Sequence, residues 1–154
     1  MPEPAHEMLF EVFNEIGIIH QLTRALLEAR LPDGLIVPHF SVVNHLCRLG
    51  DGRTPVEIAR AFQVPKTSMT HSIKVLEAKG YVEVRPNPED GRSKCVYLTD
   101  KGRALPQLAV ARLAQDIDSI TASYDPKRLL EIKPVLSELR MVLDAERNAR
   151  DGFC

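Results

Sequence analysis

One short segment, residues 81–99, most restricts how this chain can fold. The stretches YVEVR (81–85) and KCVYLT (94–99) alternate between apolar and polar side chains, which is typical of half-buried strands. The intervening PNPEDGRS contains prolines, a glycine and acidic residues, a composition that favours a turn. Helical periodicity precedes and follows this segment. The chain is therefore predicted to be mainly α with one small β-hairpin.

Apolar residues recur with helical spacing on both sides of the hairpin. Thr54, followed three residues later by Glu57, is typical of a capping box, and Gly80 suits a left-handed helix end. Thr99 is expected to cap a long helix. The predicted helices span residues 7–30, 39–49, 54–62, 66–79, 99–124 and 126–147. Two helices joined by a short turn and followed by a hairpin form a winged helix-turn-helix, here with long helices at both ends of the chain.

Positive charge is concentrated in the middle of the chain. The net charge is -1, but residues 60–103 hold nine lysines and arginines against five acidic residues, and the remainder carries -5. A helix fits the major groove of DNA, and a hairpin can carry a cation to the minor groove or the backbone. The distribution is consistent with a nucleic-acid partner, although a basic stretch of this size also fits an ordinary solvated face.

The run PVEIARAFQVPKTSMTHSIKVLEAKGYVEVRPNPEDGRSKCVYLTDKGRAL resembles the DNA-binding core of the multiple-antibiotic-resistance regulator (MarR) family. Its most specific pieces are the Asp-x-Arg of the turn and the Leu-Thr-x-x-Gly after the second strand. The resemblance is close over about residues 54–105. It implies a cytoplasmic homodimer that binds double-stranded DNA at a pseudo-palindromic operator, usually as a repressor. It also implies release by a small phenolic or other amphipathic effector, or by an oxidant.

A single MarR-type domain over residues 1–154 is the expected organisation. Residues 37–99 would form the DNA-binding lobe, and residues 7–30 and 100–147 the helical dimerisation region. The apolar stripes of the outer helices are more than one small lobe could cover, which favours a dimer; the alternative is that they pack on their own lobe. The predicted dimer interface contains Leu9, Phe13, Ile16, Leu129, Ile132, Leu136, Leu139 and Leu143.

Candidate DNA-binding residues lie on helix 66–79 and at the hairpin tip. Hydroxyl groups near a helix start can bond phosphates or bases, and lysines can neutralise phosphates. By resemblance, Arg92 is the family's minor-groove arginine, and Asp90 is expected to support the wing by pairing with a nearby cation. The alternatives are an ordinary polar helix face and a surface salt bridge. The full set is Lys66, Thr67, Ser68, Thr70, His71, Lys74, Arg92 and Lys94.

One position departs from the family. Relatives frequently carry arginine where this chain has His71, and a neutral imidazole attracts phosphate less strongly. We therefore expect DNA binding that is weaker or mildly dependent on pH.

Several other functions find no support in the sequence. Cys47, Cys95 and Cys154 lack metal-site spacing and read as free thiols, and Cys47 is expected to be buried beside Val43. The spacings of the histidines at 20, 39 and 45 favour no metal, and no cofactor or enzymatic motif is present. The absence of a long apolar run or leader pattern favours a cytoplasmic protein without a membrane partner. A protein-interaction winged helix and a thiol-based redox-sensing regulator remain as alternatives.

Overall fold

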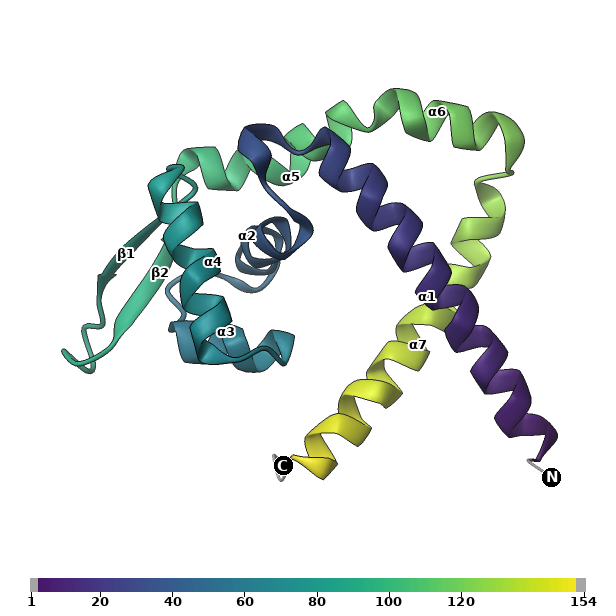
Figure 1. Ribbon diagram of the computed structural model, residues 1–154, viewed down its shortest axis with the longest axis horizontal. Helices are drawn as coiled ribbons and strands as arrows, with labels where there is room; N and C mark the ends of the chain where they lie inside the picture. Colours follow the sequence, from purple (N-terminus) through teal and green to yellow (C-terminus); the bar gives the residue numbers. More distant parts are fainter. Residues whose placement is uncertain (1–2, 152–154) are drawn as a thin grey trace. The chain divides into compact units, whose positions relative to one another are not determined.

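The computed structural model describes residues 3–151, and its elements follow the predicted order (Figure 1). The fold is mainly α with one two-stranded antiparallel sheet, as predicted. The elements are α1 (Pro4–Arg30), a short 3-10 turn η1 (Pro32–Gly34), α2 (Val37–Leu49), α3 (Pro55–Phe62), α4 (Lys66–Ala78), β1 (Val82–Pro86), β2 (Lys94–Leu98), α5 (Asp100–Arg112), α6 (Ala114–Ser123) and α7 (Lys127–Arg150).

The chain divides into two compact units, Met1–Leu113 and Ala114–Cys154. The first contains α1 to α5 and the hairpin, and the second contains α6 and α7. The sequence predicted one domain with a DNA-binding lobe (37–99) and a dimerisation region (7–30 and 100–147). This division stays a prediction, because the structure describes a single chain.

The predicted helix ends are confirmed by their hydrogen bonds. At the start of α3, the Glu57 N–H donates to Thr54 Oγ1 at 3.2 Å, and the Thr54 N–H donates to Glu57 Oε2 at 2.7 Å. At the start of α5, the Gly102 N–H donates to Thr99 Oγ1 at 3.1 Å. Gly80 follows α4 with a φ of 80°, where a side chain would be strained. Interactions between residues close in sequence thus fix the start of α3 and the end of α4, which are the two ends of the helix-turn-helix.

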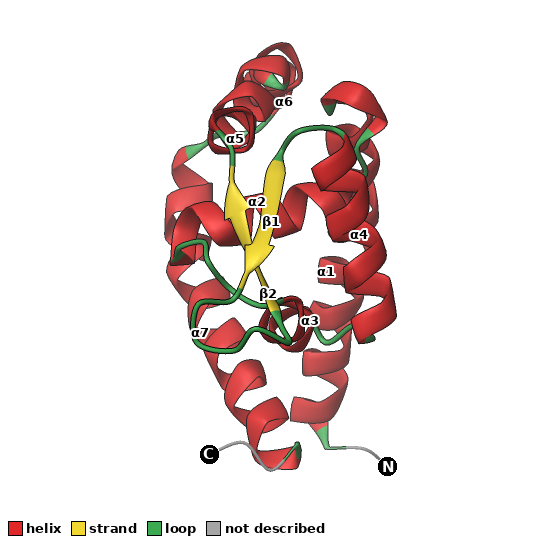
Figure 2. Cartoon of the chain, turned by 90° about the vertical axis from the view of Figure 1, so that its left-hand side faces the viewer, coloured by secondary structure: helices red, strands yellow, loops and turns green. Residues whose placement is uncertain are grey.

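The hairpin, which we call the wing (82–98), extends from the helices around it (Figure 1), and its two strands lie side by side toward the viewer in Figure 2. Val82 pairs with Leu98 and Pro86 with Lys94 in an antiparallel register. The segment before α3 joins this sheet, because the Val96 N–H donates to the Arg53 carbonyl at 2.9 Å. The base of the wing is therefore hydrogen-bonded to the rest of the lobe.

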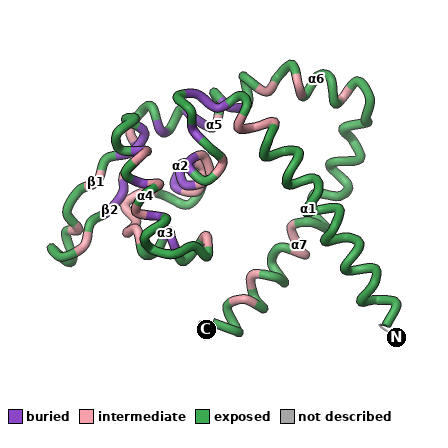
Figure 3. The backbone as a smooth tube through the Cα atoms, viewed as in Figure 1, coloured by how far each residue is buried: buried purple, intermediate pink, exposed green. Residues whose placement is uncertain are grey.

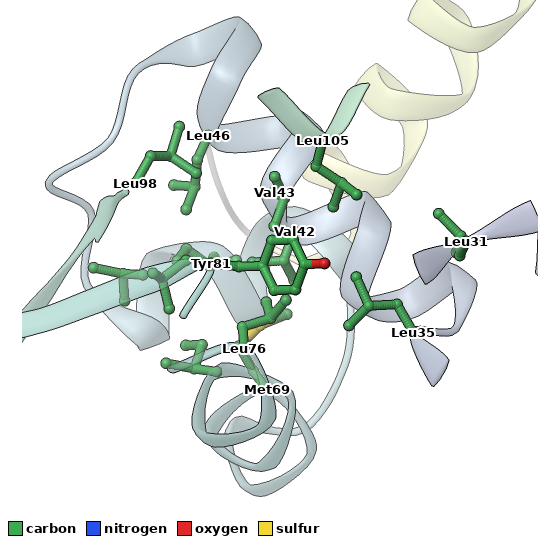
Figure 4. Packing of buried hydrophobic residues seen from close by; sticks show 14 of the residues in the cluster. Leu31, Leu35, Val42, Val43, Leu46, Met69, Leu76, Tyr81, Leu98 and Leu105 are labelled. Atoms are coloured by element: carbon green, nitrogen blue, oxygen red, sulfur yellow. The ribbon is translucent and has the colours of Figure 1, made fainter. Parts of the chain in front are cut away.

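The hydrophobic core lies between α2, α3, α4, the base of the wing and α5 (Figure 3). Figure 4 shows the Tyr81 ring within this core, near Val42 and Leu76. Tyr81 is only 1% exposed. Within the described residues, α6 and α7 contain no buried side chain, and α1 contains none either. The core accordingly supports the lobe, whereas the outer helices carry exposed apolar residues.

Two sequence expectations were wrong. The predicted helix 99–124 is interrupted at Leu113, whose φ of -82° and ψ of -6° lie in the bridge region, so that α5 and α6 are separate helices. Cys47 is exposed, because at about 100° per residue it lies about 90° from the centre of the buried stripe of α2. Cys95 is a buried free thiol, and Cys154 lies outside the described residues.

Candidate nucleic-acid interface

The outward face of α4 is fixed by the residues that it buries. Met69, Ile73 and Leu76 face the core, as predicted. The predicted contact residues of α4 lie on the remaining surface, with Thr70 half-buried and the others exposed. The Thr70 hydroxyl donates to the Lys66 carbonyl at 2.8 Å, so its hydrogen is used within the helix.

A hollow of about 500 Å³ lies between α3, α4 and the wing, and we call it the wing hollow. It brings together five of the eight predicted contact residues: Lys66, Thr70, Lys74, Arg92 and Lys94. Its other lining residues are Thr54, Pro55, Val56, Ile73, Ser93 and Val84, so none of the described side chains around it is acidic. Four positive charges around an apolar floor form a surface suited to a sugar-phosphate backbone.

The other three predicted residues, Thr67, Ser68 and His71, border a different space. They line a cavity of about 770 Å³ that also contacts α1 and α2, and we call it the histidine cavity. It is lined by His20, Arg24, Ile36, Val37, Pro38, His39, Ser41, Val42, Phe62, Val64, Thr67, Ser68, Met69, His71 and Ser72. The predicted DNA-binding residues of α4 therefore divide between two flanks of the helix.

Backbone hydrogen bonds fix the tip of the wing. Asp90 Oδ1 accepts from the Arg92 N–H at 3.0 Å, and the Ser93 N–H donates to the Asp90 carbonyl at 3.1 Å. Asn87 Nδ2 donates to Ser93 Oγ at 2.9 Å. Asp90 was expected to pair with a cation. Instead, its carboxylate accepts a hydrogen bond from the main-chain N–H of Arg92, an interaction that is common for aspartates in turns.

Arg85 and Arg92, the two arginines of the wing, differ in the interaction partners of their side chains. Arg85 donates to Glu83 Oε2 at 2.7 Å and lies 4.7 Å from the centroid of the Tyr97 ring. The hydrogen bond with Glu83 raises the pKa of Arg85. Arg92 is exposed at the tip, and no side-chain partner for it is seen in residues 3–151. The charge of Arg92 is thus available to a ligand, whereas that of Arg85 is already paired.

The sequence did not indicate the roles of Thr54, Val56 and Val84 as lining of the wing hollow, or of His20, Arg24 and His39 in the histidine cavity. The capping signal at Thr54 did place the start of α3. No local signal could indicate that residues of α1 and α4 line one cavity, because their proximity depends on the fold.

The predicted dimer residues occur in both units and are largely uncovered. On α1 and α7 they are exposed, apart from the half-buried Leu139. A shallow groove on α7 is lined by Leu129, Ile132, Lys133, Leu136, Ser137 and Arg140. A run of exposed apolar side chains of this extent is characteristic of a surface that another chain covers.

The described part of the chain has neither a metal-binding cluster nor a membrane-spanning helix. No group of three or more histidine, cysteine, aspartate or glutamate residues is arranged to hold a metal ion there. None of its helices has the length and hydrophobicity needed to span a bilayer.

Comparisons with known proteins agree with this geometry. Residues 33–93 match the model of the MarR family. The multiple antibiotic resistance protein MarR of Escherichia coli is 31% identical over 115 residues, which cover 70% of this chain and 79% of that protein. The counterpart from Salmonella typhimurium is 36% identical over the same length and coverage. The transcriptional activatory protein BadR of Rhodopseudomonas palustris is 24% identical over 153 residues, covering 97% of this chain and 84% of BadR.

Solved structures extend the likeness to the fold. A mutant MarR from Escherichia coli, crystallised with operator DNA, has a TM-score of 0.67 and 25% identity, covering 86% of this chain and 95% of that one. The regulator BldR from Sulfolobus solfataricus has a TM-score of 0.71 at 22% identity, covering 94% of this chain and 99% of that one. These regulators have the same winged-helix architecture as this chain.

Proposed function

The chain belongs to the MarR family of transcriptional regulators, and we propose that it is a homodimeric repressor that binds a pseudo-palindromic operator and is released by a small amphipathic ligand. The wing hollow carries the proposal, because Lys66, Lys74, Arg92 and Lys94 surround it without an acidic neighbour among its described lining residues. The operator-bound structure of the Escherichia coli relative supports DNA as the ligand.

A dimer would cover the exposed helices and would match an operator with two-fold symmetry. A second copy would cover the apolar residues of α1 and α7, such as Phe13 and Leu136. Its α4 would enter the next major groove on the same side of the duplex, about 10 bp away. The two Arg92 side chains would then reach the flanking minor grooves, where arginine is favoured.

The test is a titration of the purified protein against its own upstream DNA and against random duplex, at several salt concentrations. We expect tighter binding to the upstream DNA and a steep salt dependence, since each neutralised phosphate contributes a slope of about -0.9 in log K against log salt. Equal and weak binding to both duplexes would contradict this assignment and favour a winged helix that binds a protein partner.

Activation is a second candidate function, favoured by one relative that covers 97% of this chain and is named a transcriptional activatory protein. A reporter placed behind the bound DNA separates the two functions. Repression predicts higher reporter expression when the protein is deleted, whereas activation predicts lower expression.

A further inference from the structure

The tip of the wing, residues 87–93, is held by its own hydrogen bonds although most of its side chains are exposed. Within it only Asn87 and Ser93 are half-buried. They lie just beyond the last strand pair, which joins Pro86 to Lys94. Proline has no N–H to donate, so the strand pairing is weakened at this point. The tip therefore needs other contacts to keep its shape.

The Asn87 side chain supplies such contacts from both ends of its amide. Its Oδ1 accepts the Glu89 N–H at 3.0 Å, and its Nδ2 donates to Ser93 Oγ at 2.9 Å. The Asn87 N–H also donates to the Ser93 carbonyl at 3.1 Å. The Glu89 N–H fixes which end of the amide is the oxygen, because only an acceptor can face it. One residue thus bonds to both sides of the turn, and we call Asn87 and Ser93 the tip clamp.

The backbone of Asn87 is restricted as well, because Pro86 and Pro88 stand on either side of it. A residue that precedes proline favours extended conformations, and proline itself has a fixed φ. The amide of Asn87 is therefore carried by a stretch of chain with few alternative conformations. Such a stretch is suited to hold the segment 89–92, which contains Gly91.

Ser93 extends this restraint to Arg92, the residue before it. The Ser93 N–H donates to the Asp90 carbonyl at 3.1 Å, and the Ser93 hydroxyl donates to the same oxygen at 3.3 Å. The Arg92 N–H donates to Asp90 Oδ1 at 3.0 Å. The main chain is thus bonded at Arg92 and directly after it, whereas the Arg92 side chain is exposed beside the wing hollow.

We propose that Asn87 is a positioning residue, which through the tip clamp fixes the place of Arg92 before DNA is bound. This inference rests on the function proposed above, in which Arg92 reaches a minor groove. An arginine carried by an ordered turn loses less conformational freedom on binding than one carried by a mobile turn, so more of its interaction appears as affinity. Asn87 itself acts only through Arg92.

The order of the tip can be measured in the full-length protein without DNA. NMR relaxation gives an order parameter for each main-chain N–H, which is about 0.85 in rigid structure and below about 0.6 in flexible segments. We expect the N–H groups of Glu89 and Ser93 to be near the rigid value in the wild type and to become flexible in Asn87→Ala. A mobile tip in the wild type, or an equally rigid tip in the variant, would overturn the proposal.

DNA affinity separates a positioning role from a direct contact or a general loss of structure. With upstream DNA, Asn87→Ala is expected to weaken binding about fivefold and to move the salt slope toward that of Arg92→Ala. In the Arg92→Ala background, Asn87→Ala should have no further effect, because the side chain that it positions is gone. Losses that multiply in the double variant would show that Asn87 acts independently of Arg92 and would refute the proposal.

Variants of Ser93 and of a residue away from the tip provide the controls. Ser93→Ala removes the hydroxyl and should resemble Asn87→Ala, whereas Ser93→Thr keeps a hydroxyl and should retain wild-type affinity. Tyr97→Phe is the matched control, since it removes one oxygen from a half-buried side chain of β2 outside the tip. Wild-type affinity in Ser93→Ala, or a loss in Tyr97→Phe as large as that in Asn87→Ala, would contradict the tip clamp.

Failure of the tip clamp and failure of the proposed function give different results. A protein with an ordered tip that binds upstream and random DNA equally weakly would contradict the proposed function, and with it the use of Arg92 in DNA binding. A protein that binds upstream DNA tightly although its tip is mobile would contradict the tip clamp and leave the proposed function intact.

Discussion

The Tyr81 hydroxyl donates a hydrogen bond of 2.6 Å to Asp33 Oδ2, which joins the base of the wing to the turn between α1 and α2. Lys101 Nζ of α5 lies 2.9 Å from the same carboxylate and 4.4 Å from the centroid of the Tyr81 ring. Lys79, at the end of α4, donates to the Asp33 carbonyl. In Figure 4 the Tyr81 oxygen points out of the core toward the segment that carries Leu35. One residue of the turn therefore contacts both the segment that joins α4 to the wing and the start of α5.

Tyr81→Phe is expected to destabilise the lobe by about 1.5 kcal/mol, because it removes a hydrogen bond to a charged acceptor and leaves the ring packing intact. Burial and then Asp33 raise the pKa of Tyr81, so the hydroxyl remains a donor at all physiological pH values. Urea unfolding measures the change, with Tyr124→Phe on the exposed surface as the control. Equal stability of the two variants would show that the Asp33 contact contributes nothing.

The contacts of Asp33 also lead us to expect that the stability of the fold depends on pH. The hydrogen bond from Tyr81, and then the bond from Lys101, lower the pKa of Asp33. A carboxylate whose pKa is lower in the folded state stabilises it above the unfolded pKa, and this contribution is lost as pH falls through the folded pKa. Wild-type protein should therefore lose stability on acidification, and Asp33→Asn, which tolerates the φ of 57°, should lose less. Thermal melts between neutral and acidic pH measure the difference.

The lobe could be predicted from the sequence because its signals are local. The pairing of Thr54 with Glu57, the alternation on both sides of the turn and the glycine at 80 each act within a few residues. The break at Leu113 has no such signal, since neither proline nor glycine stands there. The contact between Asp33 and Tyr81 spans 48 positions and depends on the packing of the whole lobe.

The candidate site was predictable to a similar extent. Helical periodicity placed the basic and hydroxyl side chains on the outward face of α4, opposite Ile73. Their division between two flanks depends on the positions of α1 and the wing relative to α4. The true partner of Asp90 also escaped prediction, since a carboxylate in a basic turn can bind either a cation or a main-chain N–H.

Arg92→Ala is expected to weaken DNA binding and to reduce the salt slope by about one, because it removes one exposed cation. Arg85→Ala is the matched control on the same hairpin, and it should change the slope less, since Glu83 already pairs with Arg85. Fluorescence anisotropy with upstream DNA at several salt concentrations measures both. Equal slopes for the two variants would place the DNA contact elsewhere on the lobe.

Asp90→Ala and Asp90→Asn separate the two ways in which this residue could support the wing. The structure shows Asp90 Oδ1 accepting the Arg92 N–H, and an asparagine side chain can also accept there. We expect Asp90→Asn to retain DNA affinity and Asp90→Ala to reduce it several-fold. If both variants lost affinity equally, the negative charge of Asp90, rather than the hydrogen bond that its side-chain oxygen accepts, would be what supports DNA binding.

If the proposed dimer uses α7, Leu136→Glu is expected to convert it into monomers, because the substitution places a charge in the apolar groove of α7. Monomers would bind a half-site only, so DNA affinity should fall steeply while the helical content measured by circular dichroism is retained. Glu131→Lys changes charge on an exposed position of the same helix and serves as the control. Sedimentation of both variants reports the oligomeric state. A Leu136→Glu protein that sediments like wild type would show that the partner copy covers a different face, because a buried glutamate without a cation beside it is too costly for a tight interface to retain.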